Sequence, residues 1–217
     1  MNRPFLFLAT ALIALYSCQS APKADNANTT DKQQVASTNG NLFTIDTTST
    51  ITWVGTKPIG QHTGTFKLDS GAIVISNNML TGGNFIIDVV SLNSTDMSGD
   101  YKAKLDGHLK SADFFEVEKF PTAKFEITKV EAFDSTKTKS LLPGATHLIS
   151  GNLTLKSNTK NITFPAVVNI NDDAIDAKAN FNIDRTQWGM SYGNDQSLQD
   201  KFIRPEVNIQ LDIKARK

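Results

Sequence analysis

Few residues in this chain have the types and spacing that catalysis or metal binding requires. The three histidines, His62, His108 and His147, form no HxH or HxxxH pair, and nothing else lies at the spacing of metal ligands. The nucleophile-elbow, phosphate-loop and dinucleotide-binding motifs are also missing from the sequence. The sequence therefore predicts no catalytic residue, no metal site and no cofactor.

One enzymatic alternative stays open, because a histidine can pair with a serine or an aspartate that is distant in the sequence. The alternative is a secreted hydrolase. Loss of activity on a panel of esters after His108→Ala would support it, and no activity at all would count against it. The acidic residues Asp96, Asp100, Asp106 and Asp113 are scattered around a loop and a helix, as helix caps and solvated charges usually are. The residue types thus favour binding over catalysis.

The charge balance gives no sign of a nucleic-acid partner. Lysine plus arginine and aspartate plus glutamate each number 22, so the formal net charge is zero. A chain without a basic excess has no net electrostatic attraction to nucleic acid. We therefore expect no nucleic-acid binding.

Most of the chain from residue 42 onward alternates apolar and polar residues, as half-buried β-strands do. The clearest runs lie over 149–155, 162–170, 175–183 and 207–213. Each run has one dry face and one wet face, which is typical of antiparallel sheets. Short turn signals such as Asn77-Asn78 and Ser157-Asn158 separate neighbouring runs. The pattern predicts an all-β domain over 42–217, with about eight strands closed into an antiparallel barrel or folded into two sheets.

One segment breaks this pattern and predicts a short helix. Tyr101, Leu105, His108 and Leu109 recur at helical spacing, and Pro121 bars any helix further on. The segment also concentrates aromatic residues, namely Phe114, Phe115, Phe120 and Phe125. Two interpretations stay open: the aromatics plug one end of the barrel, or they form part of a specific site.

The sequence pattern does not decide whether the barrel interior is filled by side chains or holds a ligand. A barrel of about eight strands can be filled by side chains or can hold one apolar ligand. Gly151, Ala166, Ala177 and Ala179 fall at inward positions, and such small residues indicate unfilled volume. Alternatively, they lie opposite large aromatic side chains and complete ordinary packing.

The N-terminus predicts a targeting segment. A positive start is followed by the apolar run 5–16, which is too short to span a bilayer of about 30 Å. The only cysteine, Cys18, follows this run directly and matches the position of a lipidated cysteine in a bacterial lipobox, with Leu15 at the first position. We expect a signal peptide over 1–17 and lipidation of Cys18. The alternatives are an ordinary secretory cleavage that leaves a free thiol, and a buried cysteine.

Residues 18–41 predict a flexible tether. The segment is small, polar and without periodicity. A flexible coil of this length spans about 25–30 Å on average. A tether of this kind would hold the domain just off a membrane surface.

Four stretches together resemble the YceI-like proteins. They are ITWVGTK with GQHTG (51–57 and 60–64), GHLKSADFF with FPTAKF (107–115 and 120–125), GNLTLK (151–156) and FNIDRTQWGM (181–190). The resemblance implies an extended, lipocalin-like antiparallel barrel with one short helix. It also implies a binding protein of the bacterial periplasm, whose ligand is a polyisoprenoid, a quinone-like molecule or a fatty-acyl lipid. With a lipidated Cys18, the expected location becomes the periplasmic or outer-membrane surface, as a membrane-attached lipoprotein.

The resemblance and the residue pattern together predict a ligand tunnel. We expect its wall to be formed by Trp53, Phe66, Phe85, Phe125, Phe181 and Trp188, and its plug or gate by Phe114 and Phe115. A polar headgroup would lie at the mouth and meet Arg185, His108 or His62. For Arg185, an ion pair with Asp184 or Asp113 is the alternative. A structural or adhesive envelope domain with a filled barrel is the alternative function, and a homodimer is left open.

Overall fold

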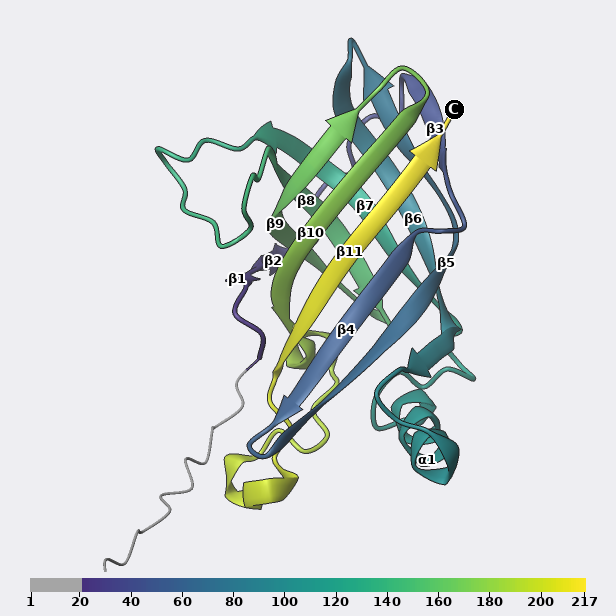
Figure 1. The fold of residues 1–217 in the computed structure, drawn as a ribbon, viewed down its shortest axis with the longest axis vertical. Coiled ribbons are helices and arrows are strands. Elements are labelled where there is room, and N and C mark those ends of the chain that lie inside the picture. The colour runs from purple at the N-terminus through teal and green to yellow at the C-terminus, as the bar shows by residue number, and fades with distance from the viewer. Residues whose placement is uncertain (1–20) are drawn as a thin grey trace, which may run out of the picture.

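The computed structural model describes residues 21–217 (Figure 1). The predicted signal peptide over 1–17 and the predicted lipidation site Cys18 lie outside the described residues. Within 21–217, no helix is long and apolar enough to cross a membrane. The elements in chain order are β1 (Asp25–Asn26), β2 (Asn28–Asp31), β3 (Asn41–Ile45), β4 (Thr50–Lys57), β5 (Gly60–Ser76), β6 (Met79–Ser94), α1 (Gly99–Lys110), β7 (Thr122–Ala132), β8 (His147–Leu155), β9 (Asn158–Ile170), β10 (Ala174–Asp184), the 3₁₀ helices η1 (Arg185–Trp188) and η2 (Gln196–Lys201), and β11 (Glu206–Arg216).

The strands form a closed antiparallel barrel of eight strand positions, as the sequence predicts. From β4 to β11 each strand pairs with the next one along the chain, and β11 pairs back with β4. Closure removes the unpaired edges that a long apolar-faced sheet would otherwise expose. The core is formed by buried apolar side chains from the barrel strands.

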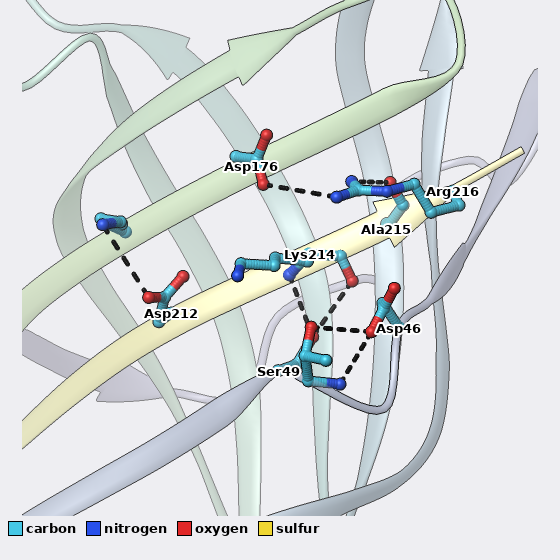
Figure 2. A network of polar contacts seen from close by, with 9 residues as sticks. Asp46, Ser49, Asp176, Asp212, Lys214, Ala215 and Arg216 are labelled. Atoms are coloured by element: carbon cyan, nitrogen blue, oxygen red, sulfur yellow. Dashed lines mark hydrogen bonds and ion pairs between the residues drawn. The ribbon is translucent and has the colours of Figure 1, made fainter.

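Strands β3 and β4 share one position in the barrel wall. β4 pairs with β5 over 60–66, and β3 pairs with the same strand over 72–75. The turn between them is bonded to β11 (Figure 2): the Asp46 amide donates to the Lys214 carbonyl at 2.7 Å, and the Ser49 hydroxyl accepts from the Lys214 amide at 2.9 Å. The two short strands therefore act as a single interrupted strand.

Inward alternation is confirmed along the barrel wall, and two glycines make room for its largest rings. A Cβ at Gly64 would lie 2.3 Å from Cζ2 of Trp53, and a Cβ at Gly151 would lie 2.2 Å from Cζ of Phe125. Only glycine leaves space for these rings against the sheet. For Gly151 the packing alternative is therefore correct: the residue completes an aromatic contact and leaves no empty volume.

The predicted helix is confirmed as α1, which lies beside the barrel and is fixed to β6 (Figure 1). The Asp106 carboxylate accepts hydrogen bonds from the Ser94 amide at 2.9 Å, from the Ser94 hydroxyl and from the Lys102 ammonium. Tyr101, which helical spacing places with the apolar residues, is instead 73% exposed. No residue of α1 is fully buried, so polar contacts contribute much of its anchoring.

The predicted flexible tether is wrong for residues 25–31, which pair with the barrel. β1 pairs with β10 at Asn182, and β2 pairs antiparallel with β9 over 160–163. β9 and β10 pair with each other only as far as Ala166 and Ala179, so residues 25–31 fill the gap where the two strands separate. The Asp31 carboxylate also accepts from Lys160 at 2.9 Å. The N-terminal segment is thus part of the sheet, and it closes a seam in the barrel wall.

The same segment explains why several residues on the polar face are buried. Asn152, at 0% exposure, accepts from the Gln33 amide at 2.9 Å and donates to the Gln33 carbonyl at 2.7 Å. Asn182 donates to the carbonyls of Pro22 and Ala24. The alternating pattern predicts a wet face here, but a strand-like segment from elsewhere in the chain covers it.

Candidate functional site

An apolar cavity of about 490 Å³ runs through the barrel interior. This volume lies within the range of about 300–1,000 Å³ that is usual for ligand pockets. Residues from every barrel strand and from α1 contribute to its wall. The lining is mostly aliphatic and aromatic: Ile51, Phe66, Leu68, Ile73, Leu80, Phe85, Ile87, Val89, Leu92, Phe125, Ile127, Ile149, Leu153, Ile162, Phe164, Val168, Phe181, Ile183, Val207, Ile209, Leu211 and Ile213 are among its members.

Of the eleven residues predicted for the wall, plug and mouth of the tunnel, ten line this cavity. They are Trp53, His62, Phe66, Phe85, His108, Phe114, Phe115, Phe125, Phe181 and Arg185. The sequence pattern does not single out Phe164, whose ring stacks on Phe181 at a centroid distance of 4.1 Å. Phe164 also contacts Phe125 at 5.9 Å, so an aromatic wall runs along this side of the cavity. The alternation over 162–170 is the signal that could have found it.

Trp188 is the predicted lining residue that the structure places elsewhere. Its side chain is 0% exposed, and it is not part of the cavity wall. Its indole Nε1 donates to the Leu153 carbonyl at 2.9 Å, and its own carbonyl accepts from the Asn158 side chain. Trp188 therefore joins η1 to the β8–β9 hairpin, and its role is structural.

Arg185 is buried in the protein and is directed at backbone carbonyls. Its guanidinium donates to the carbonyl oxygens of Met190, Tyr192, Ile203 and Arg204. Burial lowers the pKa of Arg185, and the nearby Asp184 carboxylate offsets part of that shift. Four of the five N–H donors of this side chain are thus used within the protein, which leaves at most one for a ligand.

The two carboxylates predicted as ion-pair partners of Arg185, those of Asp184 and Asp113, bond mainly to other residues. The Asp184 carboxylate accepts from the Thr186 amide at 2.9 Å and so caps η1. Asp113 lies 2.9 Å from Nε2 of His108. Arg185 thus donates to backbone carbonyl oxygens in place of the predicted ion pair. These hydrogen bonds hold the segment between η1 and β11.

An aromatic cluster forms at the end of the barrel where α1 lies. The His108 ring packs edge-on against Phe114 at 5.2 Å and against Tyr192 at 4.8 Å. The Arg185 guanidinium lies 5.6 Å from the Phe114 ring centroid, a cation–π contact. Phe115 packs edge-on against Phe66 at 5.4 Å. The sequence analysis missed Tyr192, which is 46% exposed and which no periodic pattern marks.

Polar side chains of the cavity wall gather at this same end. Lys57 and His62 come from the β4–β5 hairpin, and Lys201 from η2, which both lie at the lower end of the barrel in Figure 1. Nδ1 of His62 lies 2.9 Å from the Asp96 carboxylate. Partial burial raises the pKa of Asp96, but hydrogen bonds from His62 and the Thr63 amide outweigh it and lower the pKa overall. Apart from Lys178 of β10, the charged side chains of the lining thus lie at this mouth, and the rest of the cavity wall is mostly apolar.

The third histidine lies apart from this mouth. His147 begins β8, and its Nδ1 lies 2.8 Å from the hydroxyl of the neighbouring Thr146. Burial lowers the pKa of His147, which favours the neutral ring. His147 is not part of the cavity wall.

The small inward residues have two different roles. Ala166, Ala177 and Ala179 line the cavity, as the unfilled-volume interpretation predicts. Gly151 instead accommodates the ring of Phe125. The barrel is therefore packed at some layers and open at others.

A closed antiparallel barrel around an apolar cavity, with one short helix at its mouth, defines a lipocalin-like protein. The chain belongs to the YceI-like family, because the family model described as the YceI-like domain matches residues 33–215. This confirms the resemblance found in the sequence. Among curated relatives, a UPF0312 protein of Pseudomonas putida strain W619 is 38% identical over 95 residues, which cover 40% of this chain and 45% of the relative. The match thus spans less than half of that relative's length.

Solved structures show the same fold at low sequence identity. BcnA of Burkholderia cenocepacia is similar with a TM-score of 0.61 at 19% identity, over 79% of this chain and 99% of BcnA. A polyisoprenoid binding domain from Saccharophagus degradans, implicated in plant cell wall breakdown, is similar with a TM-score of 0.59 at 17% identity, over 80% and 97% of the two chains. At these identities the comparison establishes the fold.

Proposed function

We propose that this protein binds one long apolar ligand inside its barrel and thereby sequesters or carries it in the bacterial cell envelope. The observation that carries the proposal is the apolar cavity of about 490 Å³, which runs through the barrel and has most of its polar lining residues at one mouth. Each methylene group moved from water into such a cavity contributes about 0.8 kcal/mol. A chain of ten apolar carbons would therefore gain roughly 8 kcal/mol before its ordering costs.

The class of ligand follows from the shape and polarity of the cavity. A polyisoprenoid, a quinone-like molecule or a fatty-acyl lipid combines a long apolar chain with one polar end. The chain would lie along the aromatic wall of Phe85, Phe125, Phe164 and Phe181. The polar end would lie at the mouth beside His62, His108 and Lys201. The polyisoprenoid binding domain with the same fold supports this class.

The two alternative functions have less support. A structural domain with a filled barrel does not require a cavity of this size. A hydrolase requires a nucleophilic hydroxyl that bonds to one of the mouth histidines, and the carboxylates that bond to His62 and His108 cannot take the place of that hydroxyl. Within 21–217, neither of these two histidines has a serine or threonine hydroxyl as a hydrogen-bond partner. We therefore propose a binding protein without catalytic activity.

Native mass spectrometry with organic extraction tests the proposal. The full chain would be purified from a bacterial host and measured without denaturation. We expect a co-purifying apolar species at near one-to-one stoichiometry, and its mass names the ligand class. A ligand-free mass, together with failure to take up added polyprenyl and fatty-acyl probes, would refute the proposal.

The envelope location is tested separately through Cys18. We propose that lipidation of Cys18 attaches the protein to a membrane. Cys18→Ser should move the protein from the membrane fraction to the soluble fraction and abolish the incorporation of labelled palmitate. Equal fractionation and labelling of the wild type and the variant would contradict the anchor without affecting the proposed ligand.

A further inference from the structure

Exposed apolar side chains lie around the mouth of the cavity. Ile59, in the turn between β4 and β5, is 69% exposed, and Leu198 of η2 is 42% exposed. The Arg204 amide donates to the Thr56 carbonyl at 3.0 Å, so the segment that follows η2 is joined to the end of β4. Both the β4–β5 hairpin and η2 lie at the lower end of the barrel (Figure 1), where Tyr192 of the cavity wall is also partly exposed. The mouth is therefore rimmed by apolar groups that face solvent.

The chemistry of this rim fits a lipid surface. Neither Ile59 nor Leu198 lines the cavity, so neither is needed to contact a ligand inside it. The charges beside them are mixed, because Lys57 and Lys201 belong to the cavity wall at the mouth and Asp195 caps η2. This mixture does not favour a partner of strong net charge. Apolar side chains with lysines at their edge suit the boundary between the headgroups and the acyl chains of a bilayer.

The N-terminal segment leads to the same end of the barrel. The Asn182 side chain donates to the Pro22 carbonyl at 3.4 Å, and Asn182 is two residues before the end of β10, where η1 begins. Four residues along the chain separate Pro22 from Cys18, a span of at most about 14 Å. The opposite end of the barrel lies farther away, since the 17 residues of β5 cover roughly 50 Å. A lipid on Cys18, as proposed above, would hold the mouth near the membrane.

We propose that the mouth of the barrel docks on the surface of a lipid bilayer, with Ile59 and Leu198 inserted among the headgroups, and that the apolar ligand passes directly between bilayer and cavity. A ligand that crossed water instead would expose its methylene groups, and each one lowers its equilibrium concentration in water on the order of fourfold. Docking removes this step. The inference rests on the proposed function and names the source of the ligand and its route.

The rate of ligand transfer tests the docking. The full chain, loaded with a fluorescent fatty-acyl probe, would deliver the probe to phosphatidylcholine vesicles, with Cys18→Ser in every sample so that no anchor at this position contributes. Transfer by docking should become faster as the vesicle concentration rises, whereas transfer through water is limited by release of the probe and does not depend on that concentration. We expect Ile59→Ser combined with Leu198→Ser to slow the transfer at least tenfold, because two apolar groups no longer insert. Met79→Ser is the matched control, since Met79 is 61% exposed at the opposite end of β5 and β6.

Two results of this experiment separate the inference from the proposed function. A transfer rate that does not depend on vesicle concentration and is equal in all variants would overturn the docking and leave ligand binding intact. Failure of the protein to take up the probe would overturn the proposed function and this inference with it.

Hydrogen exchange gives a second measurement that needs no substitution at the mouth. Vesicles should slow amide exchange in residues 57–60 and 191–202 and leave residues 76–80 at the opposite end unchanged. Equal protection of both ends, or protection of neither, would overturn the inference.

Discussion

Arg185 holds the segment between η1 and β11 through four hydrogen bonds to carbonyl oxygens, from a side chain that is 4% exposed. Hydrogen bonds that involve a charged group contribute more than neutral ones, and a planar guanidinium can serve several acceptors at once. The same segment supplies Tyr192 and Lys201 to the mouth of the cavity. Arg185 thus shapes the entrance indirectly, by fixing the backbone that carries other mouth residues.

Replacing Arg185 by lysine should destabilise the protein. A lysine has a single nitrogen and cannot reach four carbonyls, so at least one buried acceptor is left unpaired. We expect a loss of about 2 kcal/mol or more in the free energy of unfolding, which lowers the melting temperature by about 4–8 °C. Calorimetry measures the change, and Arg216→Lys is the matched control, since Arg216 is exposed and 3.9 Å from Asp176. Equal melting temperatures for the two variants would contradict this role of Arg185.

Ala179→Phe should block ligand binding without unfolding the barrel. Ala179 is 5% exposed and lines the cavity, so the added ring would occupy the volume that the ligand needs. We expect the affinity for a fatty-acyl or polyprenyl probe to fall at least tenfold, about 1.4 kcal/mol. Fluorescence titration measures the affinity, and Ala132→Phe makes the same change at an exposed position outside the lining. Unchanged binding by Ala179→Phe would show that the ligand lies elsewhere.

At the scale of elements, the N-terminal segment and α1 both complete the barrel from outside. Residues 25–31 lie between β9 and β10 below the point where these strands separate. α1 covers the neighbourhood of the mouth and is fixed by Asp106 to the end of β6. Both attachments include hydrogen bonds from a single side chain to backbone groups, Asn152 for the N-terminal segment and Asp106 for α1, so single polar substitutions should loosen them.

Asn152→Ala should release the N-terminal segment from the barrel. The substitution removes the hydrogen bonds of Asn152 with both backbone groups of Gln33. Losing them should speed amide exchange in residues 21–40 by about tenfold or more. Hydrogen-exchange mass spectrometry measures this, with Asn84→Ala as the control at an exposed position of β6. Exchange that is equally slow in both variants would mean that strand pairing alone holds the segment.

The attachment of α1 should depend on pH through Asp106. Partial burial raises the pKa of Asp106, but hydrogen bonds from Lys102 and Ser94 outweigh it and hold the pKa below the ordinary value of 3.8. Because the folded pKa is lower than the unfolded one, the stabilisation is complete above pH 3.8 and is lost as the pH falls through the folded pKa.

Asp106→Asn removes this titration and serves as the comparison. Urea unfolding between about pH 6 and pH 2 should show the wild type more stable than the variant at the upper end, with the difference shrinking below the ordinary pKa of 3.8. A difference that stays constant down to the lowest pH would mean that Asp106 does not titrate in this range.

At the scale of the whole molecule, a ligand held in the apolar cavity of the closed barrel should stabilise the folded protein. A ligand that binds only the folded state adds about 2.7 kcal/mol at a concentration of one hundred times Kd. For a chain of this size, that raises the melting temperature by about 5–10 °C. Calorimetry before and after organic extraction of the ligand measures the shift. Ala179→Phe should show no such shift, and equal melting temperatures of loaded and extracted wild type would count against binding in the cavity.

The residue pattern by itself determined the antiparallel strands, the helix that the structure places at Gly99–Lys110, and ten of the eleven tunnel residues that line the cavity. These are local properties: a two-residue period fixes which side chains point inward, and helical spacing marks the one exception. The pattern left a barrel and two packed sheets open, and the family resemblance favoured the barrel. The family resemblance could be found from the sequence for the same reason, because each of its motifs is a contiguous stretch of residues.

Tertiary structure decided the features that join distant segments. The N-terminal strands pair through backbone groups, which leave no mark on a small polar sequence, so residues 25–31 were predicted as part of a tether. Trp188 and Arg185 look like ligand-binding residues by type, but their acceptors come from Leu153 and from residues 190–204. A side chain's type fixes what it can donate or accept, and only the folded chain decides which partner comes within reach. Among residues 21–217, no acceptor comes within hydrogen-bond distance of the indole nitrogen of Trp53.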